Sequence, residues 1–110
     1  MSYHIHITKT AERDIADAAD YIEFSLMNPL AVEHLFNLIE EKISFLSSTP
    51  NMYPLVADPV LCTWGIRFVM INNYLAFYII DEHKKNVYIV RFLCSKRNWI
   101  HILKTEDFNK

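Results

Sequence analysis

The sequence predicts a single α+β domain in the order β-α-α-β-β-β, with an antiparallel sheet and the two N-terminal helices packed on one face. Two observations favour this class. Apolar residues recur at helical spacing in the first half of the chain, and three β-rich runs separated by turn residues fill the second half. The length of 110 residues suits one domain, and a hydrophobic fraction of 52% is enough to form a substantial core.

The N-terminal half predicts one strand and two helices. Residues 3–8 alternate between apolar and polar side chains, which indicates a short half-buried strand. We expect Thr10 to cap a first amphipathic helix that runs to about Met27. Asn28-Pro29 is a start signal for a second helix, and residues 47–50 end it. Because almost no residues separate the two helices, they must form a hairpin or a sharp corner.

The C-terminal half predicts a loop, three strands and a short helix. Residues 51–63 contain two prolines and no clear period, so we expect a loop there. The strands are predicted at 65–71, 74–81 and 87–94, and Asn72-Asn73 between the first two suits a tight hairpin turn. Residues 98–103 predict a final helix, followed by a polar tail.

The hairpin register predicts which side chains share a face of the sheet. A two-residue turn pairs Ile71 with Tyr74 and Arg67 with Tyr78. One face then carries apolar residues and is expected to pack on the two helices: Ile66, Phe68, Met70, Leu75, Phe77 and Ile79. A four-residue loop before the last strand adds Tyr88, Val90, Phe92 and Cys94 to that face. It places Arg91 on the outer face, opposite Ala76 and diagonal to Arg67 and Tyr78, and Tyr74 lies on the same face.

The residues expected on or near the outer face have the composition of a surface that binds phosphate and unpaired bases. They are Arg67, Arg91, Lys96, Arg97, Tyr74, Tyr78 and Trp99. Guanidinium groups bind phosphate oxygens, aromatic rings stack on bases, and fixed positive charge stabilises a phosphorane during RNA cleavage. His101, one turn from Arg97, is a candidate general acid or base. The alternatives are that the arginines decorate a solvated sheet face and that His101 only flanks the final helix.

Cofactor and metal chemistry are not expected. Gly65 is the single glycine, so glycine-rich phosphate-binding loops are excluded. His4 and His6 have a spacing that can bind metal, but no third ligand is visible. Cys62 and Cys94 lack the spacing of a zinc site. The aspartates of the first helix are expected to lie on its solvated surface: Asp14, Asp17 and Asp20.

The two halves of the chain carry opposite charge. Residues 1–63 contain three basic and nine acidic residues, a balance of −6, whereas residues 64–110 contain eight basic and four acidic residues, a balance of +4. An anionic partner is therefore expected at the C-terminal half, unless the acidic residues only solubilise exposed helices.

The N-terminus lacks a signal-peptide pattern, and the apolar run 68–80 is too short to span a membrane. We expect a cytoplasmic protein without membrane contact and with reduced thiols.

Six segments carry a resemblance to a known family. In order, they are TKTAERDI (8–15), DYI (20–22), NP (28–29), GIR (65–67), NYLAFY (73–78), and VRFL with KRNWIHIL (90–103). They are distributed along nearly the whole chain, and together they resemble the RelE/ParE superfamily of toxins from bacterial type II toxin–antitoxin (plasmid stabilisation) systems. The resemblance implies the same β-α-α-β-β-β fold and a cognate antitoxin that neutralises the toxin, with a toxin–antitoxin hetero-oligomer as one form of the complex.

The resemblance also implies two alternative activities. RelE-like members cleave messenger RNA in the ribosome without metal, through attack of a ribose 2′-hydroxyl on the adjacent phosphate. Arg67 and Arg97 match two of their arginines, whereas Leu103 stands near the position of their C-terminal tyrosine. We expect this activity, with Arg67, Arg97 and His101 as catalytic residues and with a binding surface of Arg91, Lys96, Tyr74, Tyr78 and Trp99. The alternative is the ParE-like activity, which inhibits DNA gyrase without a nuclease site. An acidic antitoxin segment is expected to mask Arg67 and Arg97.

Overall fold

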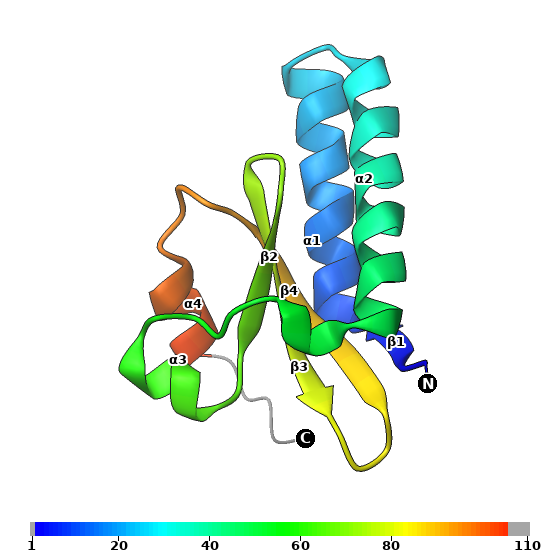
Figure 1. Cartoon of the computed structure of the whole chain (residues 1–110). Helices are drawn as coiled ribbons and strands as arrows, with labels where there is room; N and C mark the ends of the chain where they lie inside the picture. Colours follow the sequence, from blue (N-terminus) through cyan, green and yellow to red (C-terminus); the bar gives the residue numbers. More distant parts are fainter. Residues whose placement is uncertain (1, 106–110) are drawn as a thin grey trace.

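The computed structural model describes residues 2–105 and confirms the predicted α+β class (Figure 1). Its N-terminal half contains β1 (His4–Ile7), α1 (Lys9–Asp20), a π-helical turn (Tyr21–Ser25) and α2 (Pro29–Ser48). The remainder contains a 3₁₀ turn (Pro50–Met52), α3 (Pro59–Thr63), β2 (Arg67–Ile71), β3 (Tyr74–Asp81), β4 (Asn86–Cys94) and α4 (Trp99–Lys104). The 3₁₀ turn and α3 fall mostly in the segment predicted as loop, and the predicted polar tail at 106–110 lies outside the described residues.

Side-chain caps define where the two long helices begin. Thr8, and not Thr10, caps α1, because the Thr8 Oγ1 accepts the backbone N–H of Ala11 at 3.1 Å. The predicted start of α2 is confirmed, since Asn28 Oδ1 accepts the N–H of Ala31 at 3.2 Å and a proline occupies the first turn. Between the helices, the π-helical turn and a positive φ of 52° at Met27 reverse the chain within a few residues.

The four strands form one sheet in the order β1-β4-β3-β2, with β1 parallel to β4 and the other pairs antiparallel. The predicted hairpin register is confirmed, because Ile71 pairs with Tyr74 and Arg67 with Tyr78. Asn72 has the positive φ, 55°, that such a tight turn favours. Within residues 2–105, none of the helices combines the length and apolar character needed to cross a bilayer.

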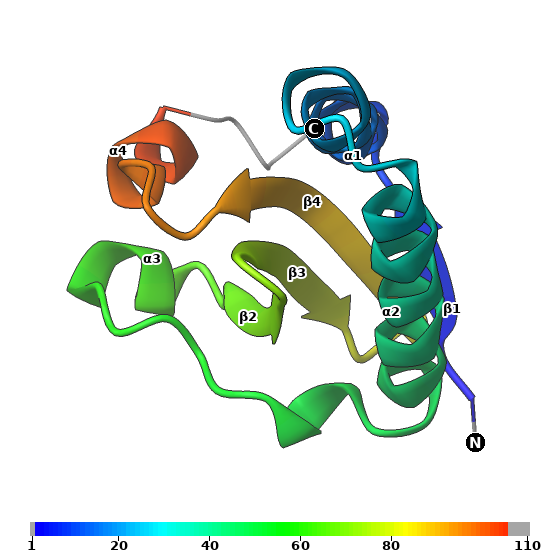
Figure 2. The same ribbon diagram turned by 90° about the horizontal axis from the view of Figure 1, so that it is seen from above.

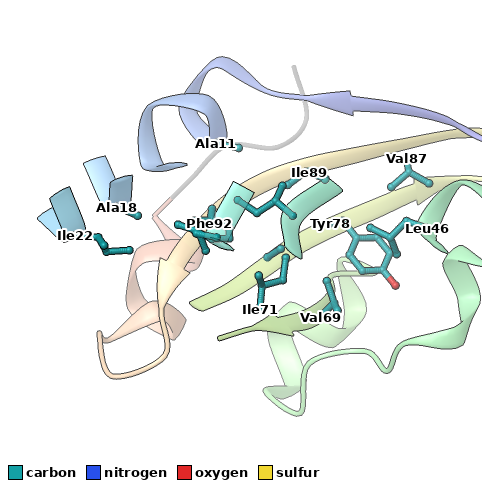
Figure 3. Close-up of a cluster of buried hydrophobic side chains, with 13 residues drawn as sticks. Ala11, Ala18, Ile22, Leu46, Val69, Ile71, Tyr78, Val87, Ile89 and Phe92 are labelled. Carbon is teal, nitrogen blue, oxygen red and sulfur yellow. The ribbon is translucent and has the colours of Figure 1, made fainter. Parts of the chain in front are cut away.

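The helices α1 and α2 pack on the face of the sheet opposite to the one predicted. Val69, Ile71, Ala76 and Tyr78 form a core with residues of both helices (Figure 3). Tyr78 is fully buried, and its hydroxyl donates a hydrogen bond to the carbonyl oxygen of Pro50 at 2.7 Å. Burial raises the pKa of Tyr78 to about 12. The prediction that Tyr78 lies on an outer face is therefore wrong: its ring fills the core because its one polar atom has a buried acceptor.

The apolar face predicted to meet the two long helices is covered by other elements. Ile66, Leu75 and Phe77 pack with Leu61 of α3 and Leu103 of α4. Both faces of the sheet are thus buried, and Figure 2 shows the strands between α1 and α2 on one side and α3 and α4 on the other. Met70 is an exception to the predicted core, since 58% of its surface is exposed.

A β-bulge in β4 changes the predicted facing of its last residues. Tyr78 pairs with Ile89 but Phe77 pairs with Arg91, so Val90 is an additional residue in the strand. Beyond this bulge Phe92 packs on the side of α1 and α2, whereas Leu93 packs on the opposite side. The predictions that Phe92 shares a face with Val90 and that Arg91 lies opposite Ala76 are therefore wrong.

Candidate functional site

A shallow cleft of about 400 Å³ lies between α1 and the adjacent ends of β3 and β4. Its lining combines carboxylates, aromatic rings, a thiol and one guanidinium: Asp14, Asp17, Ala18, Tyr21, Tyr74, Phe92, Cys94 and Arg97. Tyr74 and Arg97 were predicted as site residues, so the structure brings two of the eight candidates into this cleft.

One wall of the cleft is fixed by an ion pair between α1 and β4. The Asp14 carboxylate accepts hydrogen bonds from Arg91 Nε at 2.7 Å, Arg91 Nη2 at 3.0 Å and the backbone N–H of Phe92 at 3.1 Å. The two charged side chains are only 11% and 12% exposed. Strand β1 pairs with β4 only as far as Ile89. Beyond that residue, the Thr8 hydroxyl donates to the carbonyl oxygen of Val90 at 3.3 Å, and Asp14 accepts the N–H of Phe92. Asp14 is therefore not on a solvated surface as predicted, and Arg91 supports the architecture instead of presenting its charge to a ligand.

The floor of the cleft is aromatic. Tyr74 is partly buried and stacks on Phe92, with ring centroids 5.0 Å apart and an interplanar angle of 17°. Burial raises the pKa of Tyr74 above its ordinary value of 10.0. A tyrosine hydroxyl is protonated at neutral pH even at the ordinary value, so Tyr74 offers a neutral hydrogen-bond donor. Cys94 lies next to Tyr74 in the strand register, while Tyr21 from the π-helical turn is 55% exposed on the helical wall.

Three basic candidate residues follow β4, two in the connection to α4 and one in α4 itself. Lys96, Arg97 and His101 are all exposed, and the backbone N–H of Arg97 donates to the carbonyl of Cys94 at 3.1 Å. Asn98 caps α4 by accepting the N–H of His101 at 3.3 Å. Trp99, another candidate, packs on the buried Phe77, with ring centroids 5.1 Å apart, so its ring contributes to the core below α4. Among the predicted site residues, the positive charges that a ligand can reach are therefore those of Lys96 and Arg97, with His101 one turn later.

Arg67 lies at the other end of the sheet. Its Nη1 donates to the carbonyl oxygens of Tyr53 at 2.5 Å and Asn51 at 3.4 Å. Because Ile71 pairs with Tyr74 at the cleft, Arg67 stands four residues away, or about 13 Å along the strand. The prediction that Arg67, Arg91 and Arg97 converge is therefore wrong, although Arg67 lies on the same face of the sheet as the cleft.

The cleft also contains residues that sequence reasoning missed. Asp17, Ala18 and Tyr21 follow Asp14 at intervals that place all four on one side of a helix, and this spacing was the available signal.

His6, one of the residues considered as a metal ligand, contacts other side chains of the sheet. Its ring stacks on that of Tyr88, with centroids 5.1 Å apart, and its Nε2 is hydrogen-bonded to the Asn86 Oδ1 at 3.2 Å. Among residues 2–105, no three His, Cys, Asp or Glu side chains are grouped closely enough to hold a metal ion.

Comparison with known proteins gives one family and a set of similar folds. The family model described as "ParE toxin of type II toxin-antitoxin system, parDE" matches residues 5–99. The chromosomal ParDE toxin–antitoxin system from P. aeruginosa has a chain with a TM-score of 0.67 and 18% identity, and the match covers 84% of this chain and 96% of that one. The toxin–antitoxin complex RelBE2 from Mycobacterium tuberculosis has a chain with a TM-score of 0.60 and 20% identity, and the match covers 86% of this chain and 99% of that one. None of the curated proteins matches the sequence.

Proposed function

The chain belongs to the ParE toxin family of type II toxin–antitoxin systems, and from this membership we propose that it inhibits DNA gyrase by binding it, without cleaving RNA. This was the alternative activity that the sequence resemblance implied. The observation that favours it is the separation of the three arginines on which the nuclease expectation depended.

Cleavage of RNA without a metal requires several positive groups around one phosphate, because charge accumulates on its oxygens in the transition state. Here Arg91 is held by Asp14, and Arg67 is bonded to two backbone carbonyls at the far end of β2. Of these three arginines, Arg97 alone lines the cleft. This distribution supports a toxin that acts through a binding surface.

We propose that a cognate antitoxin neutralises the toxin by placing an acidic segment over Lys96 and Arg97. Both side chains are exposed beside the cleft, and residues 64–110 carry the positive balance of the chain. Both similar structures come from toxin–antitoxin systems. Association between opposite charges is fast and sensitive to salt, so Arg97→Glu should slow antitoxin binding most strongly at low ionic strength.

A second candidate is the ribosome-dependent mRNA endoribonuclease. It is favoured by the presence of Arg97 and a protonated Tyr74 hydroxyl in one cleft, with His101 a turn away from the arginine. In that activity Arg97 would stabilise phosphate charge, and Tyr74 or His101 would transfer a proton. Arg67 would contribute only to stability.

Both candidate targets, DNA gyrase and the ribosome, are cytoplasmic, and we propose that the toxin acts in the cytoplasm.

The decisive experiment runs a gyrase supercoiling assay beside the mapping of mRNA ends on translating ribosomes, with the same purified toxin. We expect supercoiling to be inhibited and the mRNA to remain intact. Cleavage at ribosome-bound codons, unaffected by EDTA and reduced by about 10²- to 10³-fold in Arg97→Ala, would instead establish the nuclease. Arg67→Ala serves as the matched control, since it removes an arginine outside the cleft.

A further inference from the structure

The tip of the α1–α2 hairpin exposes large apolar side chains. We define the hairpin-tip surface as Tyr21, Phe24, Leu26, Met27 and Leu30, which are 55%, 70%, 56%, 82% and 70% exposed. Figure 1 shows that the hairpin extends past the sheet, so that none of the other elements formed by residues 2–105 covers its tip. Single exposed apolar residues are ordinary, but several adjacent ones of this size are typical of a protein interaction site.

Acidic residues lie close to this apolar surface in the sequence. Residues 17–33, which form the end of α1, the hairpin turn and the start of α2, contain no lysine or arginine but four acidic residues: Asp17, Asp20, Glu23 and Glu33. The last turn of α1 has no basic residue, although a cation there would complement the helix dipole. Within residues 2–105, no ion pair involves Asp20, Glu23 or Glu33, and all three are exposed. The surface is thus complementary to apolar side chains flanked by positive ones.

We propose that the hairpin-tip surface docks a segment of the toxin's target protein that presents apolar side chains between lysines or arginines. The inference rests on the proposed function, because it requires a target that is bound as a protein. A second copy of the chain fits poorly, since a two-fold contact would bring Asp20 and Glu23 of both copies together. An acidic antitoxin segment would be repelled by the same charges, and it has a complementary site at Lys96 and Arg97.

The test measures the affinity of immobilised toxin for the gyrase holoenzyme and for the cognate antitoxin. The double variant Phe24→Ser/Met27→Ser removes the most exposed apolar pair, and Met52→Ser is the matched control, because Met52 is 57% exposed but follows the far end of α2. We expect at least about tenfold weaker gyrase binding by the double variant, unchanged antitoxin binding, and wild-type behaviour of the control. Glu23→Lys should weaken gyrase binding at low salt, and the difference should fade at about 1 M salt, where charges are screened within about 3 Å.

Each contrary result has a separate meaning. Unchanged gyrase binding by the double variant, with a wild type that binds, overturns the docking surface and leaves the proposed function intact. Loss of antitoxin binding alone assigns the tip to the antitoxin and also overturns the inference. A wild-type dimer that the double variant abolishes assigns the surface to a second copy, with the same consequence. A wild type that neither binds nor inhibits gyrase refutes the proposed function together with this inference.

Discussion

Replacing Asp14 with alanine should be among the most destabilising single substitutions outside the apolar clusters. The carboxylate accepts three hydrogen bonds, at 2.7, 3.0 and 3.1 Å, and two of them come from a guanidinium that is 12% exposed. Breaking a buried ion pair on one side leaves the other charge uncompensated and costs about 3–5 kcal/mol. The total stability of a small domain is about 5–15 kcal/mol, so the variant should lose a large part of it.

Urea denaturation followed by circular dichroism measures this loss. Asp14→Asn should lose less, because an amide oxygen still accepts the N–H of Phe92 while the charge is removed. Asp17 lies one turn further along α1 at an exposed position. The free energy of unfolding of Asp17→Ala should therefore stay within about 0.5 kcal/mol of the wild-type value. An Asp14→Ala protein within about 1 kcal/mol of the wild type would refute the argument that this contact joins α1 to the sheet.

Three further predictions test the core and one surface contact. Phe77→Ala should lower the free energy of unfolding by about 3–5 kcal/mol, because it opens a cavity in the core. Tyr78→Phe should lower it by about 1–3 kcal/mol, because the Pro50 carbonyl loses its buried donor. Urea denaturation measures both losses, and a Tyr78→Phe protein as stable as the wild type would contradict the second prediction. The hydrogen bond from Tyr3, at 2.6 Å, lowers the pKa of Glu82, so its ionised form stabilises the fold. That contribution is complete above the ordinary pKa of 4.5 and is lost as the pH falls through the lowered value. Melting curves at decreasing pH should therefore show a smaller acid loss for Glu82→Gln, and identical acid profiles would contradict the contact.

The sequence predicted the elements because their signals are local. The Asn28-Pro29 start of α2, the Asn72-Asn73 turn and the β2–β3 register all depend on neighbouring residues, and the structure confirms them. The choice of sheet face failed because it depends on what covers each face. Both faces are apolar here, and the segment predicted as loop supplies Val56 and Leu61 to the second core. Alternation within strands does not show which cover lies on which face.

The candidate site was predicted less well than the fold, for a reason that also lies in long-range contacts. Arg67, Arg91 and Arg97 look alike in the sequence, and their roles differ only through what each one meets in space: backbone carbonyls, Asp14 and the open cleft. The bulge at Val90 added to the error, because one extra residue in a strand exchanges the faces of all the residues that follow.

The parallel pairing of β1 with β4 has a consequence for how the toxin is made. His4 pairs with Asn86, so the first strand cannot pair until a residue 82 positions later in the chain has been synthesised. The α1–α2 hairpin forms through local contacts and can assemble early, whereas closing the sheet is a high-contact-order step that is intrinsically slow. The sheet, and with it the cleft between α1 and β4, can therefore be completed only when most of the chain has left the ribosome. Until that time an antitoxin meets an acidic helical hairpin, and the surface proposed to bind it does not yet exist.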